Sequence, residues 1–531
     1  MLNDKSFREA LGVLSKSSPQ AVEVERIEKN RFKEYLFIKT PIEEDFARCL
    51  KTLKGGEVIF LCGSSGDGKS AILTRYSQLY KDKVYFHLDA THSLDPTRGA
   101  LKELDLLFDK IKESQQPLVV GINIGMMANY VEGGAQEHSE IRTSMAAHIG
   151  QKKHTSRHHY FDFERYPKFE FENYGAHSEF IEKFLARLVQ DDDDNPFFQI
   201  LKHQEKTGQE NRLCVNFRLL CIPIIQKSIV ESLMKARLIR DQFMTSRALL
   251  DFIHYLLTGP SYLFDNLFTA TDNELSQSVS HFDPALIRTK QTDHFLLEYN
   301  LELVNEDFKA FNKSIQDIGV VDVNDPSSFI RIFYLLKGDS FSNNYHDRYS
   351  QDFSNLLLER FAKVWKLHDD YDGSASREKK SELLTFYNDV LLKALRRYMN
   401  RNAPRLKDKQ YFVSENNKVL FIATLRIQAN IGALIQGSSE NQSTTTFNAH
   451  LKVGSQVIPA ISINISLYNL LMQLNEGYRP NKHDKSTILI LDELVDQILD
   501  IANRESTLLV YDGSHRYEIE QNDGDFIVAG V

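Results

Sequence analysis

The segment Gly63–Ser70 reads Gly-Ser-Ser-Gly-Asp-Gly-Lys-Ser, and these residue types at this spacing can bind phosphate. The pattern G-x-x-x-x-G-K-S/T places glycines where side chains would block the backbone, a lysine that reaches the β- and γ-phosphates, and a hydroxyl that ligates Mg²⁺. We therefore expect Lys69 to contact a nucleotide and Ser70 to ligate the metal. A plain glycine turn would not need the Lys-Ser pair. The predicted nucleotide-binding residues are Gly63, Ser64, Ser65, Gly66, Asp67, Gly68, Lys69 and Ser70.

The residues on either side of this loop predict the elements that would position it. Glu57–Cys62 is a short, mostly apolar run after two glycines, which is typical of a buried strand. Ser70–Tyr80 has apolar residues at the three-to-four spacing of a helix face. A strand, a glycine loop and a helix N-terminus in this order form an anion site, because main-chain N–H groups and the helix dipole both attract negative charge.

Two further predicted strands end in polar residues. Val84–Leu88 is followed by Asp89, and Leu118–Ile124 contains Asn123 near its end. Functional groups of parallel sheets lie at the carboxyl ends of the strands. Asp89 is therefore a candidate to ligate magnesium or position water, or else a cap of the next loop. Asn123 is a candidate sensor of the γ-phosphate, or else a buried structural Asn.

The remaining elements of this region favour a parallel α/β sheet. Pro96–Glu113 has the apolar spacing of an amphipathic helix, and Tyr160–Phe163 alternates like an edge strand. Before the loop, Pro41–Leu50 predicts a helix that begins at a proline and has an acidic first turn. Strands that alternate with helices are typical of a parallel sheet.

After Lys69, a second candidate cation for the nucleotide site is Arg247, in a later predicted helix. Thr245 or Ser246 is a suitable N-cap, and Arg247 falls in the first turn of the helix that follows. Its position is like that of the lid arginine with which AAA-type ATPases touch the nucleotide. The alternative for Arg247 is an ordinary surface salt bridge.

The length of 531 residues requires several domains. The predicted fold class is α/β: an N-terminal P-loop NTPase with a parallel sheet, then an all-helical region and a smaller mixed α/β C-terminal domain. The predicted domains are 1–175 (P-loop NTPase), 176–300 (helical, lid-like), 301–405 (helical) and 406–531 (mixed α/β). The net charge of −9 argues against a protein that coats DNA with its whole surface.

One basic stretch stands out in this acidic chain. Lys393–Lys409 contains seven basic residues and one acidic residue, with Tyr398 inside it and Tyr411 close behind. A solvated helix face explains it, and so does a contact with DNA or an acidic partner.

Two apparent motifs lie near the C-terminus. Ile488–Glu493 has the form of a Walker B strand, in which Asp492 would order Mg²⁺ and Glu493 would polarise water. More than 400 residues separate it from the loop, and acids also favour the first turn of a helix. Asn481–Asp484 matches the guanine motif N-K-x-D but follows Arg479-Pro480 rather than an apolar strand, so we treat it as accidental and expect ATP.

The cysteines and the N-terminus predict a cytoplasmic protein. Met1–Ala10 lacks the apolar core of a secretory signal, and no run of about 18 uncharged apolar residues is present. The four cysteines are scattered over apolar segments and are expected to be reduced. They are Cys49, Cys62, Cys214 and Cys221.

Several of these segments together resemble one family. The loop with Ala71-Ile72-Leu73, Asp89-Ala90-Thr91, Ile122-Asn123-Ile124-Gly125 and above all Arg247–Pro260 are similar to DptF (DndF), the DNA phosphorothioation-dependent restriction proteins. This resemblance implies an ATP-using subunit of a bacterial complex with DptG and DptH (DndG and DndH) that restricts DNA lacking the phosphorothioate mark. It supplies no catalytic carboxylate, and we find no nuclease motif in this chain.

Three functions follow as hypotheses. The first is an ATPase with ATP and Mg²⁺ as cofactors, in which Lys69, Asp89, Asn123 and Arg247 act in catalysis. The second is a regulatory P-loop switch in which binding, rather than turnover, controls a partner effector. The third, a small-molecule kinase, is the weakest because no substrate-clamping arginine lid follows closely after the loop.

Overall fold

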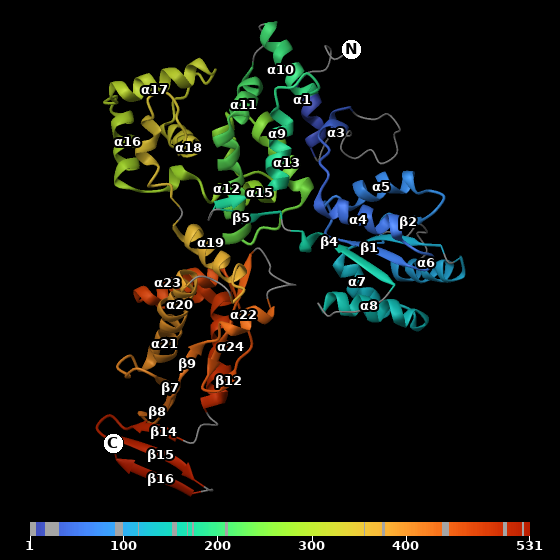
Figure 1. Cartoon of the computed structure of the whole chain (residues 1–531). Helices are drawn as coiled ribbons and strands as arrows, with labels where there is room; N and C mark the ends of the chain where they lie inside the picture. The colour runs from blue at the N-terminus through green and yellow to red at the C-terminus, as the bar shows by residue number, and fades with distance from the viewer. Residues whose placement is uncertain are drawn as a thin grey trace. The chain divides into compact units, whose positions relative to one another are not determined.

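A computed structural model describes residues 7–15, 31–90, 99–114, 116–150, 157–166, 168–172, 175–207, 211–354, 356–373, 377–437, 445–502, 507–522 and 525–530 (Figure 1). The chain is α/β and 58% helical. Its contacts divide it into two compact units. Unit 1 comprises Met1–Glu170 and Ala176–Ser354, and unit 2 comprises Phe171–Gly175 and Asn355–Val531. The boundary after Ser354 therefore falls inside the expected segment 301–405, while the expected segment 406–531 lies wholly in unit 2.

Unit 1 contains a four-stranded parallel sheet, as the sequence predicts. The strands are β1 (Val58–Cys62), β2 (Tyr85–His87), β3 (Leu118–Ile122) and β4 (His158–Asp162). Their order is β2-β3-β1-β4, so β4 is an edge strand and β1 lies inside the sheet. Every side chain of β1 is buried. Cys62 is in register with both Ile122 and Asp162, so the strands on either side of β1 end level with it.

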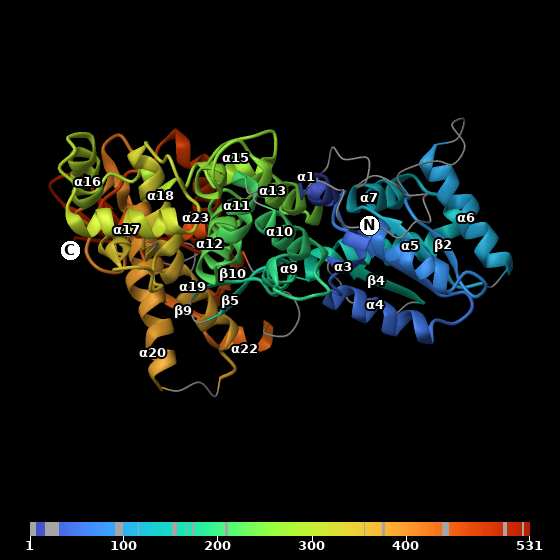
Figure 2. The same ribbon diagram turned by 90° about the horizontal axis from the view of Figure 1, so that it is seen from above.

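Helices cover both faces of this sheet (Figure 2). On one face, Phe46 and Leu50 of α4 (Pro41–Thr52) and Leu73 of α5 (Lys69–Leu79) pack on the sheet. On the other face lie α6 (Ala100–Ser114), α7 (Ile124–Gly133) and α8 (Ser139–Ile149). Each fully buried apolar side chain contributes about 1.5–3 kcal/mol, and this packing fixes the strand ends that carry the candidate site.

The rest of unit 1 is largely helical. Its N-terminal helices are α1 (Phe7–Leu11), η1 (Gly12–Leu14) and α3 (Arg31–Tyr35). The short elements η2 (Gln136–His138), η3 (Phe163–Arg165), β5 (Glu170–Glu172) and β6 (Gly175–His177) flank or follow α8 and β4. The helical part is α9 (Glu179–Val189), α10 (Pro196–Lys206), α11 (Arg212–Cys221), α12 (Pro223–Ile239), α13 (Ser246–Thr258), α14 (Leu263–Leu267), α15 (Glu274–Ser280), η4 (Pro284–Leu286), α16 (Lys290–Asn300), α17 (Glu306–Asp317), α18 (Pro326–Leu336) and η5 (Tyr345–Tyr349).

A buried ion cluster joins three of these helical elements. Arg331 of α18 donates to Asp265 of α14 at 2.7 Å and to Asp283, the cap of η4, at 2.7 Å. The hydroxyl of Ser328 also donates to Asp265. The two carboxylates and the guanidinium satisfy one another, which buried charges require.

Unit 2 is mixed α/β, as expected. Its helical elements are α19 (Leu356–Asp369), α20 (Arg377–Thr385), η6 (Phe386–Leu392, a π-helix), α21 (Lys393–Met399), η7 (Asn400–Asn402), α22 (Gly432–Gly437), α23 (Ile465–Glu476), η8 (Lys482–Asp484) and α24 (Lys485–Ala502). Its strands are β7 (Gln410–Asn416), β8 (Val419–Thr424), β9 (Ile427–Ala429), β10 (Thr446–Ala449), β11 (Leu451–Val453), β12 (Gln456–Val457), β13 (Ile461–Asn464), β14 (Thr507–Tyr511), β15 (Arg516–Asn522) and β16 (Asp525–Gly530). Five of them form an antiparallel sheet in the order β16-β15-β14-β8-β7.

The Walker B interpretation of Ile488–Glu493 is wrong. These residues lie inside helix α24, not in a strand, and Asp492 accepts a hydrogen bond from the hydroxyl of Tyr398 at 2.7 Å. The apolar run is a helix face, because Leu491, Leu494 and Ile498 are buried at helical spacing. Asn481–Asp484 forms a turn closed by Asp484, which accepts from the Asn481 main-chain N–H.

Two further expectations have outcomes in the structure. All four cysteines are free. No helix among the described residues is long and apolar enough to cross a membrane by itself. Helices α11 and α12 reach that length only together, and they are bent by 87° where they meet.

Candidate phosphate-binding site

The loop Gly63–Gly68 joins the central strand β1 to the N-terminus of α5. Gly66 and Gly68 have φ of +90° and +106°, which side chains rarely adopt. A Cβ on Gly66 would lie 3.2 Å from Cβ of Arg247 and 3.3 Å from the Thr245 hydroxyl oxygen. The glycine at position 66 is therefore required both by the backbone and by the close approach of another segment.

Several main-chain N–H groups of the loop are without a protein acceptor. Among the described residues, those of Ser65, Gly66, Gly68, Lys69 and Ser70 donate to no acceptor. They surround the first turn of α5, where the helix dipole adds partial positive charge. Ordered main-chain N–H groups normally find a partner, so a set of five at a helix N-terminus is suited to an anion.

The side chain of Lys69 lies across the loop. Its Nζ donates to the main-chain oxygens of Gly63 at 2.6 Å and of Ser64 at 2.7 Å. Partial burial lowers the pKa of Lys69, while the charges of Asp67 and Asp89 oppose the shift. The ammonium group therefore already lies at the loop, and two of its three N–H groups are engaged there.

Asp67 is the buried acid of the loop. Its side chain is 1% exposed, and its two oxygens have different partners. One oxygen accepts from the Ser64 main-chain N–H at 2.7 Å and the other from Lys168 Nζ at 2.9 Å. Lys168 also donates to the main-chain oxygen of Met244 at 2.5 Å. A single lysine therefore joins the loop to the residue that precedes the cap of α13.

The N-terminus of α13 contacts the same loop directly. Thr245 caps the helix by accepting from the Ala248 N–H at 3.0 Å, as predicted. The Arg247 N–H donates to the oxygen of Gly66 at 3.1 Å, and the Ser246 hydroxyl donates to the oxygen of Asp67 at 3.2 Å. The side chain of Arg247 is exposed beside the loop. The loop thus lies between the start of α5 and the start of α13.

Asp89 and Asn123 follow strands that end at the same edge of the sheet as the loop. Strand β3, which precedes Asn123, lies between the loop strand β1 and β2, which precedes Asp89. Asn123 caps α7, because its Oδ1 accepts from the Met126 N–H at 2.6 Å. Asn123 is therefore a half-buried helix cap rather than the fully buried structural Asn of the alternative, and its amide nitrogen remains able to donate. Asp89 is close enough to Lys69 for their charges to interact.

The sequence analysis did not identify two charged residues near the loop, Lys168 and Asp162. Lys168 was not identified because it pairs with Asp67 from a distant position in the chain. Asp162 ends β4 level with Cys62, and one of its oxygens lies 3.4 Å from Nε2 of His148. The strand-end rule that selected Asp89 would also have selected Asp162.

A metal site of protein side chains alone is not present among the described residues, which contain no cluster of three or more His, Cys, Asp or Glu side chains suited to a metal. Mg²⁺ usually binds through one or two protein oxygens together with nucleotide phosphates and water. Ser70, exposed in the first turn of α5, and Asp89 fit that requirement.

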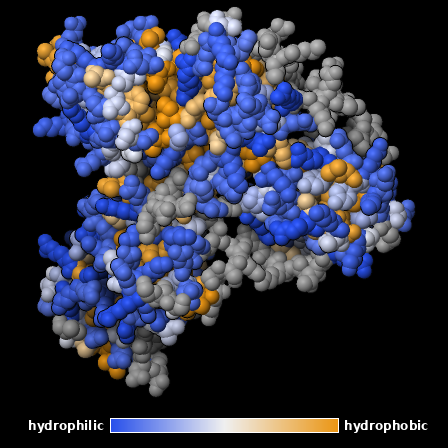
Figure 3. Space-filling model, turned by 45° about the horizontal axis from the view of Figure 1, so that its top comes forward, coloured by the Kyte–Doolittle hydropathy of each residue, from blue (hydrophilic) through white to orange (hydrophobic). Residues whose placement is uncertain are grey.

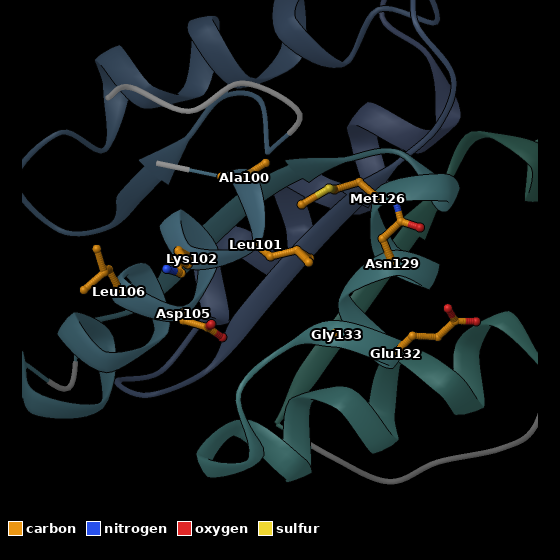
Figure 4. A pocket seen from close by; sticks show the side chains of 10 residues that line it. Ala100, Leu101, Lys102, Asp105, Leu106, Met126, Asn129, Glu132 and Gly133 are labelled. Atoms are coloured by element: carbon orange, nitrogen blue, oxygen red, sulfur yellow. The ribbon is translucent and has the colours of Figure 1, made fainter. Parts of the chain in front are cut away.

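A groove of about 1040 Å³ lies between α6 and α7 (Figure 4). It is lined by Lys102, Asp105, Asn129 and Glu132 among others, and by no residue of the loop. Asp105 is engaged in the fold, since it accepts from the Tyr130 hydroxyl at 2.6 Å. The groove is therefore separate from the candidate phosphate site.

The basic stretch Lys393–Lys409 lies in unit 2 and is partly built into the fold. Arg396 pairs with Asp408 at 2.7 Å, Arg397 donates to the oxygens of Leu474 and Asn475, and Arg401 lies 4.2 Å from the ring centre of Tyr398. The exposed cations of this stretch that could still take a ligand are Lys393, Arg405, Lys407 and Lys409.

Comparison with known proteins finds no relative: the chain matches no family model, no curated protein and no solved structure.

Proposed function

We propose that the chain binds ATP with Mg²⁺ at the loop Gly63–Ser70 and hydrolyses it. The observation that carries this proposal is the set of five main-chain N–H groups that have no acceptor within the part of the chain that the structure describes, at the N-terminus of α5 beside the Lys69 ammonium group. Main-chain donors, a helix dipole and a lysine together select a phosphate chain over a neutral ligand.

The neighbouring residues have defined roles in this proposal. Lys69 neutralises the β- and γ-phosphates, and Ser70 ligates Mg²⁺. Asp89 completes the magnesium shell or orders water, and the Asn123 amide donates to the γ-phosphate. Arg247, whose main chain contacts the loop and whose side chain is exposed, compensates the charge of the nucleotide in this proposal. Bound Mg²⁺ would supply charge neutralisation of the phosphates.

We further propose that this activity serves a DNA restriction complex. The resemblance of Arg247–Pro260 and of the loop region to DptF is the support for this step, and it implies DptG and DptH as partners. The exposed cations of Lys393–Lys409 give a DNA backbone or an acidic partner a local contact on an otherwise acidic chain.

A regulatory switch is the second candidate, and one observation favours it. Lys168, Ser246 and Arg247 join the loop to α13, so a ligand that moves the loop also changes contacts of the helical part of unit 1. A ligand shifts such an equilibrium only by its differential affinity for the two states. Tight retention of nucleotide with little turnover would then be the functional property.

Calorimetric titration with ATP and Mg²⁺ tests the binding step. Lys69→Ala should abolish measurable binding, whereas Lys81→Ala, an exposed lysine after α5, should bind like the unaltered chain. Absence of ATP uptake by the unaltered chain refutes both candidates. Steady-state ATP turnover then separates them, since rapid hydrolysis excludes the switch and stable retention excludes the ATPase.

The complex is tested by a separate measurement. ATP turnover is compared for the chain alone and with DptG and DptH, with and without phosphorothioate-modified DNA. Restriction of unmodified DNA in cells should be lost with Lys69→Ala and kept with Lys81→Ala. Full restriction by a Lys69→Ala complex refutes the proposed role.

A further inference from the structure

Strand β16 is an exposed apolar edge of the five-stranded sheet in unit 2. Phe526, Ile527 and Val528 are 68%, 53% and 59% exposed. No other three consecutive residues of the described chain are all exposed and large apolar ones. The molecular face in Figure 3 is mostly hydrophilic, with smaller hydrophobic patches. An edge strand of this kind presents unpaired main-chain N–H and C=O groups beside apolar side chains, which is a template for another strand.

The opposite edge of the same sheet is protected, and β16 is not. Strand β7 has an irregularity between Phe412 and Ser414, and it carries exposed Glu415. Bulges and edge charges both discourage pairing with another chain. By contrast, β16 pairs with β15 over six residues without a shift, and it contains no proline or lysine. Its one charged residue is Asp525, at its start.

We propose that β16 pairs antiparallel with β16 of a second copy of this chain. A two-fold axis through Ile527 places the two Ile527 residues opposite each other. The same axis places Phe526 opposite Val528 of the second copy, and Asp525 opposite Ala529. The pairing thus joins apolar residues and keeps the two Asp525 carboxylates at opposite ends of the contact, which avoids like charges across the strands.

The neighbouring strand extends this apolar contact. Residues directly opposite in an antiparallel pair point to the same face, so Ile519 of β15 lies beside Val528. The two copies together then form one apolar band across the joined sheets, from Ile519 through Val528 and Phe526 to their counterparts. A one-residue slip of the second copy would place its Ile527 on the face that carries Phe526 and Val528 of the first, and the pair would lose its two-fold symmetry.

The two edges of the five-stranded sheet favour a closed dimer over an open head-to-tail array of copies. Pairing of β16 with β7 of another copy would leave a free β16 at one end and would grow without closure. The irregularity in β7 and its Glu415 oppose that pairing. When β16 pairs with β16 of a second copy, the exposed edge of each copy becomes paired and assembly stops at the dimer.

Sedimentation velocity and light scattering of the full chain over a range of concentrations test this inference. The unaltered chain should approach twice the monomer mass. Ile527→Lys places two ammonium groups opposite each other and should weaken self-association by at least about tenfold. Val457→Lys is the matched control, because Val457 is 64% exposed on β12, an edge strand of a different sheet. This variant should remain dimeric.

Two further variants keep the test independent of folding defects. An equimolar mixture of Ile527→Lys and Ile527→Glu should restore the dimer mass that each variant alone lacks. Ile527→Cys should form an intermolecular disulfide on mild oxidation, whereas Val457→Cys should not. A monomeric unaltered chain, a dimer that Ile527→Lys leaves unchanged, or assembly only after addition of a different protein would each overturn the inference. None of these outcomes bears on nucleotide binding in unit 1.

Discussion

Replacing Lys168 by methionine isolates the contact between the loop Gly63–Gly68 and the helical part of unit 1. Lys168 is 21% exposed and its partner Asp67 is 1% exposed, so the variant leaves a buried carboxylate with only the Ser64 N–H as donor. Breaking a buried ion pair from one side costs roughly 3–5 kcal/mol. Because Lys168 retains some contact with water and Ser64 still donates, we expect the free energy of unfolding of unit 1 to fall by an amount near the lower limit, about 3 kcal/mol.

The double variant Asp67→Asn with Lys168→Met should recover most of that loss. Burial lowers the pKa of Lys168 although Asp67 opposes the shift, so desolvation of the Lys168 ammonium group outweighs its attraction to Asp67. A neutral pair of similar size is often as stable as a buried ion pair. We therefore expect the free energy of unfolding of the double variant to lie within about 1 kcal/mol of that of the unaltered chain. A double-mutant cycle gives the coupling energy between Asp67 and Lys168.

Hydrogen exchange of the amides in β1 and α5 is the suitable assay, since it reports on unit 1 alone. The only tryptophan of the chain, Trp365, lies in unit 2, and its fluorescence during urea unfolding should not change. Lys183→Met is the matched control, because Lys183 pairs with Glu179 on an exposed helix surface and should cost at most about 0.5 kcal/mol.

The same variant tests the coupling to α13. Loss of Lys168 should also weaken ATP binding and increase exchange in the first turn of α13. A Lys168→Met chain that loses no more stability than the Lys183→Met control would show that the ion pair contributes nothing to the loop, and the reasoning above would fail.

Three other perturbations have definite expected outcomes. Burial lowers the pKa of His368 from 6.5 to about 4, so the unfolded chain binds a proton more tightly and unit 2 should lose roughly 3 kcal/mol as the pH falls from about 6.5 to 4. Trp365 fluorescence in urea should detect this loss, and His368→Phe should remove it. Gly66→Ala places a side chain at φ +90° and should cost about 1–2 kcal/mol and weaken ATP binding in calorimetry. Gly454→Ala, at φ +59° with open space around it, should cost similar backbone strain but leave ATP affinity unchanged. Arg331→Met removes the partner of two buried carboxylates, and hydrogen exchange in α18 should show a loss of about 3–5 kcal/mol, unlike an exposed Arg288→Met control.

The local elements of the sheet domain could be predicted because their signals are local. An unbroken apolar run specified β1, and helical spacing specified α5 and α4 to within two residues at each end. The cap at Thr245 was also readable, because a polar residue before an amphipathic run is a local pattern. The spacing of the loop motif also indicated that Gly68 adopts a backbone conformation that a side chain would block, but it gave no such reason for Gly66.

Contacts between distant segments could not be predicted in the same way. Nothing near Asp67 in the sequence indicates Lys168, and nothing near Gly66 indicates the Arg247 N–H, because both contacts depend on how the helical part packs against the sheet. The sequence left Ile488–Leu491 open between a Walker B strand and the start of a helix for a related reason. A short apolar run fits a strand or a buried helix face equally well, and only the packing of α24 decides between them.

The resting position of the Lys69 ammonium group has a consequence for selectivity. Two of its three N–H groups are engaged by the carbonyls of Gly63 and Ser64, so a ligand that needs more than one of them must displace a carbonyl. An orthophosphate or sulfate ion offers few contacts in exchange, whereas a polyphosphate chain engages the amides and the lysine together. In the proposed function, this arrangement would therefore favour a polyphosphate chain over a small inorganic anion.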